Sequence, residues 1–365
     1  MLPSRTLEPL PTRHPPGPSR PAPVASPRFE WAIAFFQTWL VSGLYLDGWA
    51  HNHIAALETF FSPWHALLYS GLFAMTGFVF GIVQRNHAAG RPWRRSLPAG
   101  YGTLPAGAVI FLVGGLLDMT WHILFGIESS INGLISPPHL LIAAGATLIG
   151  MAPVRAAWLR PDARLASWRR QGPMLLALAY TLSLEMFLTQ YVHPFSTPYL
   201  SLRHETTNPY YGQAIGTASV FLQTALLMSF VALLIRRWAW RLPTGVMTLI
   251  LTVTAALMST QRDEYLVVPI GLVAGVGADL LGGWLRPAVQ RPRRLRAFAF
   301  LVPVLLYTLT WIVFAAVEGT WWSAHLLVGT AIMAGVVGWS TSFVALPPAL
   351  PGPRLTGVAE PSRLG

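Results

Sequence analysis

Long runs of apolar residues, separated by short connections rich in polar residues, make up most of the chain. A helix needs about 20 such residues to cross a hydrocarbon core of about 30 Å. Ten runs approach or exceed this length, at 30–51, 64–84, 103–125, 137–158, 173–193, 212–236, 243–261, 265–285, 295–317 and 322–345. We therefore expect an all-α integral membrane protein with about ten transmembrane helices.

The predicted helices fall into consecutive pairs, which indicates repeated helical hairpins. The hairpins lie near 30–84, 103–158, 173–236, 243–285 and 295–345, within a transmembrane domain that covers residues 29–346. Residues 1–28 are rich in proline and contain no long apolar run, so we interpret them as a disordered cytoplasmic tail and not as a signal peptide. Residues 347–365 are similar in composition and are expected to form a flexible cytoplasmic tail.

The distribution of arginine predicts the orientation of the chain. The sequence contains 25 arginines and no lysine. Arginines gather in the two tails and in alternate connections between the predicted helices, whereas the other connections hold only Arg203 and Arg262. Because cytoplasmic loops carry the excess of positive charge, we place the arginine-rich connections and both termini on the cytoplasmic side of the cell membrane.

The composition excludes several classes of protein. Hydrophobic residues make up 53% of the chain and charged residues only 11%, whereas soluble domains carry about 25% charged residues. A soluble enzyme, a secreted module and a nucleic-acid-binding protein are therefore excluded, despite the net charge of +11. The absence of cysteine excludes disulfides, thiolate metal sites and iron–sulfur clusters.

The first two predicted hairpins share a pattern of ionisable residues on the side opposite the arginines. Each has an aspartate, a histidine four residues later, a glutamate, and a histidine just after a Ser-Pro pair that opens the next helix. The residues are Asp47, His51, Glu58 and His65 in the first copy, and Asp118, His122, Glu128 and His139 in the second. An ionisable group within the bilayer costs about 2.5–3.5 kcal/mol or more without a partner or water, so we expect these side chains to share one interior site.

Each position in this pattern suits a metal site. The aspartate and the histidine four residues later lie on one face of a helix. Ser62 and Ser136 are expected to be N-caps, which places His65 and His139 in the first helical turn. We predict that Asp47, His51, His65, Asp118, His122 and His139 bind the metal, and that Glu58 and Glu128 act as a catalytic base or as bridging groups.

Weaker copies of the pattern occur later in the chain. Near the C-terminus, Thr308 and Ile312 replace the aspartate and the first histidine, while Glu318 and His325 remain. Glu185 and His193 also lie toward the arginine-poor side of the predicted domain. These last four ionisable residues are additional candidates for the site.

The segment from Asp118 to His139 resembles part of a known enzyme family. Asp118-Met-Thr-Trp-His122, followed by His139, is similar to the Asp-x-Ser-Trp-His…His copper-site segment in the C subunit of particulate methane and ammonia monooxygenases. The resemblance implies that Asp118, His122 and His139 are copper ligands. It is local and does not extend to the whole chain.

We interpret the sequence as a metal-dependent membrane enzyme with its site open to the extracytoplasmic side. Imidazole and carboxylate ligands suit copper, zinc or iron, and their number is sufficient for a dinuclear centre. The reaction, hydrolysis or oxidation, stays open; the substrate is expected to be a small or lipid-soluble molecule. Two alternatives also stay open: a transporter or ion pathway, and a non-catalytic metal-binding or assembly factor. Expected partners are the lipid bilayer and further subunits, but not nucleic acid.

Overall fold

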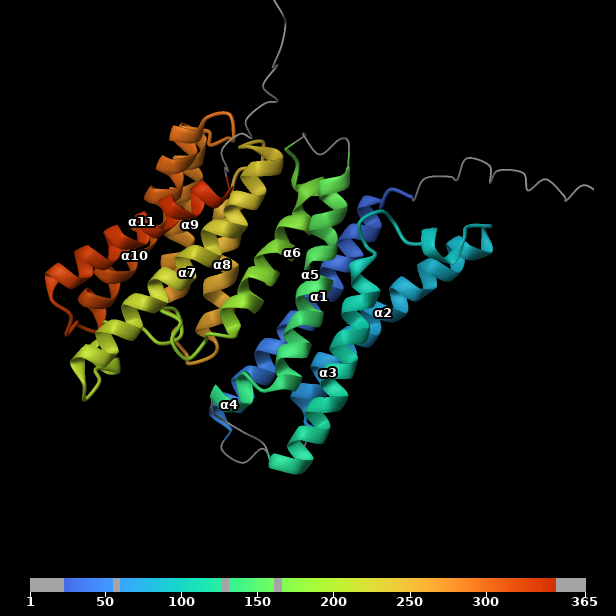
Figure 1. Ribbon diagram of the computed structural model, residues 1–365, viewed down its shortest axis with the longest axis horizontal. Helices are drawn as coiled ribbons and strands as arrows, with labels where there is room; N and C mark the ends of the chain where they lie inside the picture. The colour runs from blue at the N-terminus through green and yellow to red at the C-terminus, as the bar shows by residue number, and fades with distance from the viewer. Residues whose placement is uncertain (1–22, 55–59, 127–130, 161–165, 346–365) are drawn as a thin grey trace, which may run out of the picture.

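The computed structural model describes residues 23–54, 60–126, 131–160 and 166–345, and these residues are almost entirely helical (Figure 1). The long helices are α1 (Pro27–His53), α2 (Pro63–Ala88), α3 (Thr103–Phe125), α5 (Pro137–Leu159), α6 (Trp168–Phe187), α7 (Pro209–Trp238), α8 (Val246–Ser259), α9 (Val267–Leu285), α10 (Pro292–Val317) and α11 (Ala324–Ala345). Three short elements are η1 (Trp93–Arg95), α4 (Ile131–Leu134) and η2 (Leu202–His204). Each predicted range therefore overlaps one of these ten helices, although the range 173–193 extends six residues past the end of α6, and α4 was not predicted.

Seven of the described helices are long and apolar enough to cross a membrane: α2, α3, α5, α7, α9, α10 and α11. The protein is thus an α-helical, multi-pass membrane protein. Helix α8 is apolar but only 14 residues long, and α1 and α6 do not meet the same criteria. Ten crossings, and the side of the membrane on which the termini lie, stay predictions.

Serine and proline define where α1, α2 and α5 begin. Ser26, Ser62 and Ser136 each accept a hydrogen bond from a backbone N–H three residues later, and a proline follows each serine at the first helical position. These are the side-chain and backbone preferences of a helix N-terminus. The prediction that Ser62 and Ser136 are N-caps is confirmed.

Close packing joins most, but not all, of the expected helix pairs. Helices α1 and α2, α3 and α5, α8 and α9, and α10 and α11 pack against each other along their lengths. The third pair is different: α6 packs against α1, α5 and α8, while α7 packs mainly against α11. Helix α6 therefore lies at the centre of the helices. The expected hairpin near 173–236 does not form a closely packed pair, because α6 and α7 contact each other at few residues.

Contacts between the first two hairpins are sparse. Few residues of α2 approach α3, and few residues of α1 approach α5. Within the second hairpin, by contrast, α3 and α5 cross so closely that a Cβ atom on Gly107 would lie 2.6 Å from the Gly145 carbonyl oxygen. Small residues permit this approach of helix backbones, which gains van der Waals contact where lipid gives little hydrophobic drive.

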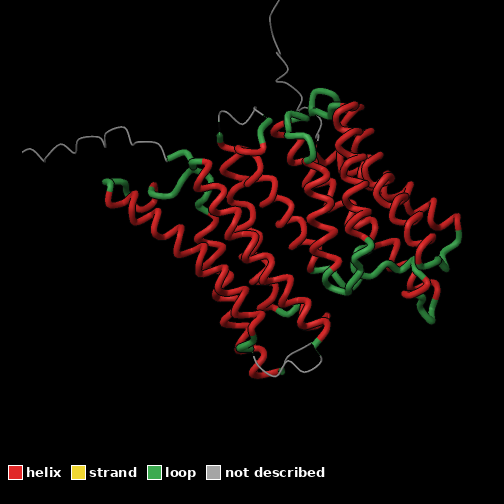
Figure 2. Tube along the Cα trace, turned by 180° about the vertical axis from the view of Figure 1, so that it is seen from behind, coloured by secondary structure: helices red, strands yellow, loops and turns green. Residues whose placement is uncertain are grey.

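The long helices alternate in direction, so their connections gather at two ends of the molecule (Figures 1 and 2). The arginine-poor end, lower in Figure 1, contains the C-terminal ends of α1, α3, α6, α8 and α10. The arginine-rich end contains the C-terminal ends of α2, α5, α7 and α9. The two classes of loop predicted from the sequence are therefore separated in space.

Candidate metal centre

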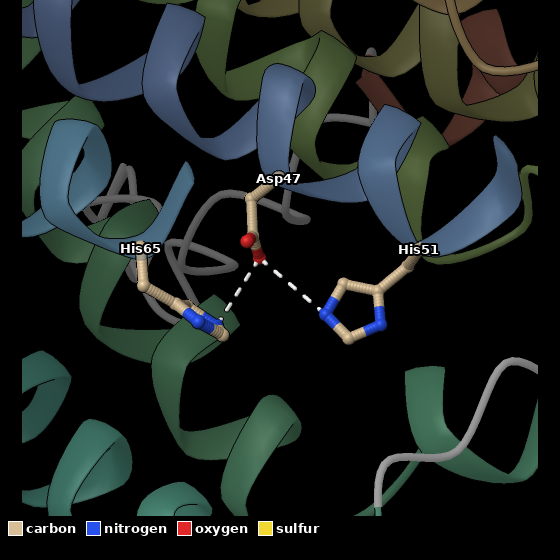
Figure 3. A group of neighbouring side chains, drawn as sticks. All are labelled: Asp47, His51 and His65. Carbon is tan, nitrogen blue, oxygen red and sulfur yellow. Dashed lines mark ion pairs between the residues drawn. The ribbon is translucent and has the colours of Figure 1, made fainter. Parts of the chain in front are cut away.

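Three of the predicted ligands form a compact group at the arginine-poor end. The Asp47 carboxylate on α1 lies between two imidazoles, 3.9 Å from His51 Nε2 and 3.5 Å from His65 Nε2 (Figure 3). One ligand atom from each of the three residues lies within 4.8 Å of the others. Protein ligands bind zinc at about 2.0–2.2 Å, so small side-chain rotations would bring all three atoms to one ion.

The second copy of the pattern also gathers around its aspartate, although among the described residues only the first set brings one ligand atom from each member within 4.8 Å of the others. Asp118 on α3 is only 1% exposed, and its Oδ2 lies 3.4 Å from His122 Nε2. His139 at the start of α5 places its Nδ1 3.5 Å from Asp118 Oδ1. As in the first group, a carboxylate on one helix meets a histidine four residues later and a histidine from the next long helix.

The two groups are parts of a single cluster. The His122 ring lies 6.2 Å from the His51 ring and 6.5 Å from the His65 ring, measured between centroids. Four helices, α1, α2, α3 and α5, thus bring all six predicted metal ligands together. We call these six residues the Asp/His cluster: Asp47, His51, His65, Asp118, His122 and His139.

Backbone carbonyls determine which nitrogen of two of these rings carries the proton. The Phe60 carbonyl lies 2.7 Å from His65 Nδ1, and the Gly126 carbonyl lies 3.3 Å from His122 Nδ1. Because a carbonyl can only accept, Nδ1 must donate in both rings, which leaves the Nε2 lone pairs facing the two aspartates. This is the orientation in which histidine binds metals.

The cluster contains buried polar atoms that lack hydrogen-bond partners. Within the described part of the chain, His51 Nε2, His122 Nε2 and Asp118 Oδ1 have none. Buried polar groups are almost always paired, and an imidazole lone pair that faces a carboxylate needs a proton or a metal ion between them. The residues present therefore fit a bound cation.

A cavity of about 90 Å³ lies beside the cluster. Five cluster residues, all but His122, line it together with apolar side chains of α1, α2, α5 and α6, among them Leu44, Leu68, Ile142 and Leu184. A second cavity, of about 510 Å³, shares His51, Asn52 and Tyr191 with the first and extends to Arg262 at the arginine-poor end. The second cavity therefore adjoins the first on the side of the arginine-poor end.

Glu185 is the additional candidate that the structure brings to the same cavity. It lies on α6, in the cavity wall, and Glu185 Oε1 accepts a hydrogen bond of 2.7 Å from Thr147 Oγ1 on α5. Glu58 and Glu128, the predicted catalytic residues, lie outside the described residues, so the structure says nothing of their positions.

The other additional candidates lie away from this cavity. Glu318 accepts a hydrogen bond from Ser201 and lies 3.8 Å from the Arg203 guanidinium. His325 is exposed at the start of α11. His193 is buried in the loop after α6, where its Nδ1 accepts a hydrogen bond from the Phe195 backbone N–H.

Some polar residues around the cluster were not among the predicted ones. The Tyr69 hydroxyl is buried in the cavity wall, four residues after His65 and hence on the same face of α2; this spacing could have identified it. Asn52 donates to Gln190 at 2.8 Å and to Gln261 at 3.2 Å. Asn52, Gln190 and Gln261 come from distant segments of the chain, so no sequence pattern links them.

Burial of His193 gives a testable dependence of stability on pH. It lowers the pKa of His193 to about 3, whereas an unfolded histidine titrates near 6.5. Between these values the unfolded chain binds more protons than the folded one, so acid destabilises the protein, by about 2 kcal/mol from this residue at pH 5.

We therefore expect His193→Asn, which retains an acceptor for the Phe195 N–H, to lose less stability than the wild type between pH 7.5 and pH 5. Thermal unfolding in detergent at the two pH values measures the difference. Parallel losses in both proteins would contradict the assignment.

Comparison with known proteins gives no relative for this chain. No family model, no curated protein and no solved structure matches it.

Proposed function

We propose that this protein is a membrane-embedded, metal-dependent enzyme whose centre is the Asp/His cluster. One observation carries the proposal: six potential ligands from four helices converge beside a cavity, with buried nitrogen and oxygen atoms that lack partners. Ionisable groups in a membrane protein are costly, and they are kept mainly where they perform a function.

The ligand set limits the choice of metal. Imidazole and carboxylate without sulfur suit zinc, copper(II) or iron. Asp47, His51 and His65 would hold one ion, and Asp118, His122 and His139 would hold a second if the centre is dinuclear. The resemblance of the segment 118–139 to a copper site makes copper the first metal to test. A bound ion would supply Lewis-acid or redox chemistry to a molecule in the cavity.

The cavity suggests what the chain itself contributes. Its walls are largely apolar, so they favour a small molecule with apolar character over a highly charged one. Glu185 lies in the wall with its carboxylate held by Thr147, a position from which it could accept or deliver a proton. Access from the arginine-poor end would be extracytoplasmic by the positive-inside rule.

The first experiment measures the metal content of the detergent-purified, full-length protein by plasma mass spectrometry. The wild type, reconstituted separately with copper, zinc, iron and manganese, is expected to retain one or two equivalents of one metal. The His51→Ala/His122→Ala double variant should lose it, because each group of three ligands loses a histidine. His53→Ala is the matched control: His53 lies near His51 on α1 but contacts the Trp49 carbonyl and Asp263 instead.

The outcomes separate the candidate functions. Metal retained by the wild type and by His53→Ala, but lost from the double variant, supports the proposal. If no metal binds to the wild type, the metal-dependent enzyme is overturned, and the cluster is a proton-linked or structural network. Metal that exchanges within seconds with a chelator would favour a carrier over an enzyme.

A further inference from the structure

A large recess opens at the arginine-rich end of the molecule, far from the Asp/His cluster. Its volume is about 1170 Å³, and its walls come from the loop after α7, the start of α8, the last turns of α9 and the segment between α9 and α10. We call it the arginine-lined recess. Nothing in the proposed enzyme activity uses it.

The short length of α8 explains why the recess exists. Its 14 residues extend about 21 Å at 1.5 Å per residue, less than the hydrocarbon core of about 30 Å. The loop of residues 239–245 must therefore descend toward the membrane to meet α8. Irregular backbone at such a depth is tolerated where it lines a polar or water-filled space.

Three arginines line this space. Arg241 follows α7, Arg286 ends α9, and Arg291 precedes α10; the side chains of all three are exposed. Three positive charges in one recess favour an anionic ligand, and guanidinium groups suit phosphate oxygens because they donate in pairs.

One carboxylate in the recess wall, Asp279, offsets only part of the charge of the three arginines, and its oxygens already accept hydrogen bonds. Asp279 Oδ1 accepts a hydrogen bond from the Met247 backbone N–H at 3.1 Å. Its Oδ2 accepts from the Thr248 backbone N–H at 2.9 Å and from the Thr248 hydroxyl at 2.7 Å. Asp279 thus serves as the cap of α8, and the arginines remain for a ligand.

The backbone provides an independent indication. Of the described non-glycine residues, only three have a positive φ, and two of them, Ala239 and Arg286, line the recess. Arg286 ends α9 in the left-handed conformation, with φ 47°, where glycine is the favoured residue. An arginine at this position of α9, where glycine would be less strained, is consistent with a requirement for the Arg286 side chain.

Tryptophan places the recess at the level of the lipid headgroups. Trp284, in the last turn of α9, is 73% exposed, and Trp240 lines the recess itself. Tryptophan gathers at the boundary between hydrocarbon and water. Basic pockets between helices on the cytoplasmic side are the surroundings in which anionic headgroups bind.

From these observations we propose that the arginine-lined recess binds a phosphate group, supplied by an anionic phospholipid headgroup or by free phosphate. Arg241, Arg286 and Arg291 contact the phosphate oxygens, and the acyl chains of a lipid would lie along the apolar surface of α9. The site is independent of the metal centre and would persist if the protein bound no metal.

Native mass spectrometry of the full-length protein with phosphatidylglycerol or phosphatidylcholine tests the proposal, beside thermal unfolding with and without inorganic phosphate. The wild type should retain phosphatidylglycerol in preference to phosphatidylcholine. Arg286→Gln/Arg291→Gln should bind phosphatidylglycerol about 30-fold more weakly, since each arginine near an anionic surface contributes about a fivefold factor. The matched control is Arg94→Gln/Arg95→Gln, two exposed arginines of η1 at the same end but outside the recess.

A second variant separates ligand binding from folding. Arg286→Gly suits the positive φ, so it should unfold at an equal or higher temperature than the wild type in the absence of ligand while it loses the lipid. Stabilisation by inorganic phosphate that is lost in the recess variants, without a lipid preference, would assign the site to free phosphate. Two results would overturn the proposal. One is an equal loss of phosphatidylglycerol binding in the recess and control variants. The other is a wild type that retains phosphatidylglycerol no better than phosphatidylcholine and is not stabilised by inorganic phosphate.

Discussion

His65→Ala is expected to weaken binding of one metal ion by at least about 100-fold. Removal of residues that only orient ligands costs about 10–100-fold in metal affinity, and His65 would be a ligand itself. Its ring is held for this purpose, with Nδ1 donating to the Phe60 carbonyl and Nε2 facing Asp47. Titration of the metal-free protein against a competing chelator measures the affinity.

The same titration of His139→Ala distinguishes one ion from two. The atoms of Asp47, His51 and His65 already lie within 4.8 Å of one another, so this group should bind its ion without the second group. If the centre is dinuclear, His139→Ala loses one equivalent and retains the ion held by His65. His53→Ala should bind as the wild type does. Wild-type affinity in His65→Ala would contradict the ligand assignment.

Arg160→Met is expected to destabilise the protein by about 3–5 kcal/mol, because it leaves a buried carboxylate without its charge partner. Arg160 at the end of α5 is 7% exposed and donates to Glu30, which is 2% exposed at the start of α1, at 2.6 Å. Arg160 also donates to the Arg170 carbonyl. Thermal or denaturant unfolding in detergent measures the loss.

Two controls make this prediction specific to the ion pair. The Glu30→Gln/Arg160→Met double variant removes both charges and should recover much of the lost stability. Arg155→Met replaces an exposed arginine of the same helix and should change the stability by less than about 0.5 kcal/mol. If Arg160→Met and Arg155→Met were equally stable, the buried pair would not stabilise the fold.

The sequence predicted the helices and the six residues of the cluster because both depend on local spacing. Apolar runs and the Ser-Pro starts determined the helix ranges, and the separation of four residues in Asp47/His51 and Asp118/His122 determined which side chains share a face. The repeat in two hairpins then indicated that both sets belong to one site. All six residues meet at the arginine-poor end, although metal binding itself stays a prediction.

The arrangement of helices relative to one another was not predictable in the same way. In a membrane, lipid-facing and helix-facing positions are both apolar, so hydropathy does not reveal which helices are neighbours. For this reason the sequence did not reveal that α6 and α7, although consecutive, pack mainly against other helices. The arrival of Glu185 in the cavity is another result of helix packing, since it depends on α6 packing against α1 and α5. Glu318 matched the repeat, yet it pairs with Ser201 and Arg203.

The sparse contact between the first two hairpins has a consequence for how the protein is made. Helices α1 and α2 pack on α3 and α5 at few positions, but the Glu30–Arg160 ion pair and the shared neighbour α6 also join them. An ion bound in the Asp/His cluster would add a further cross-link between the two hairpins. Each hairpin could enter the membrane during synthesis with its helices already paired. The ion would then arrive from the arginine-poor end and join the two hairpins, so that maturation would depend on metal supply on that side of the membrane.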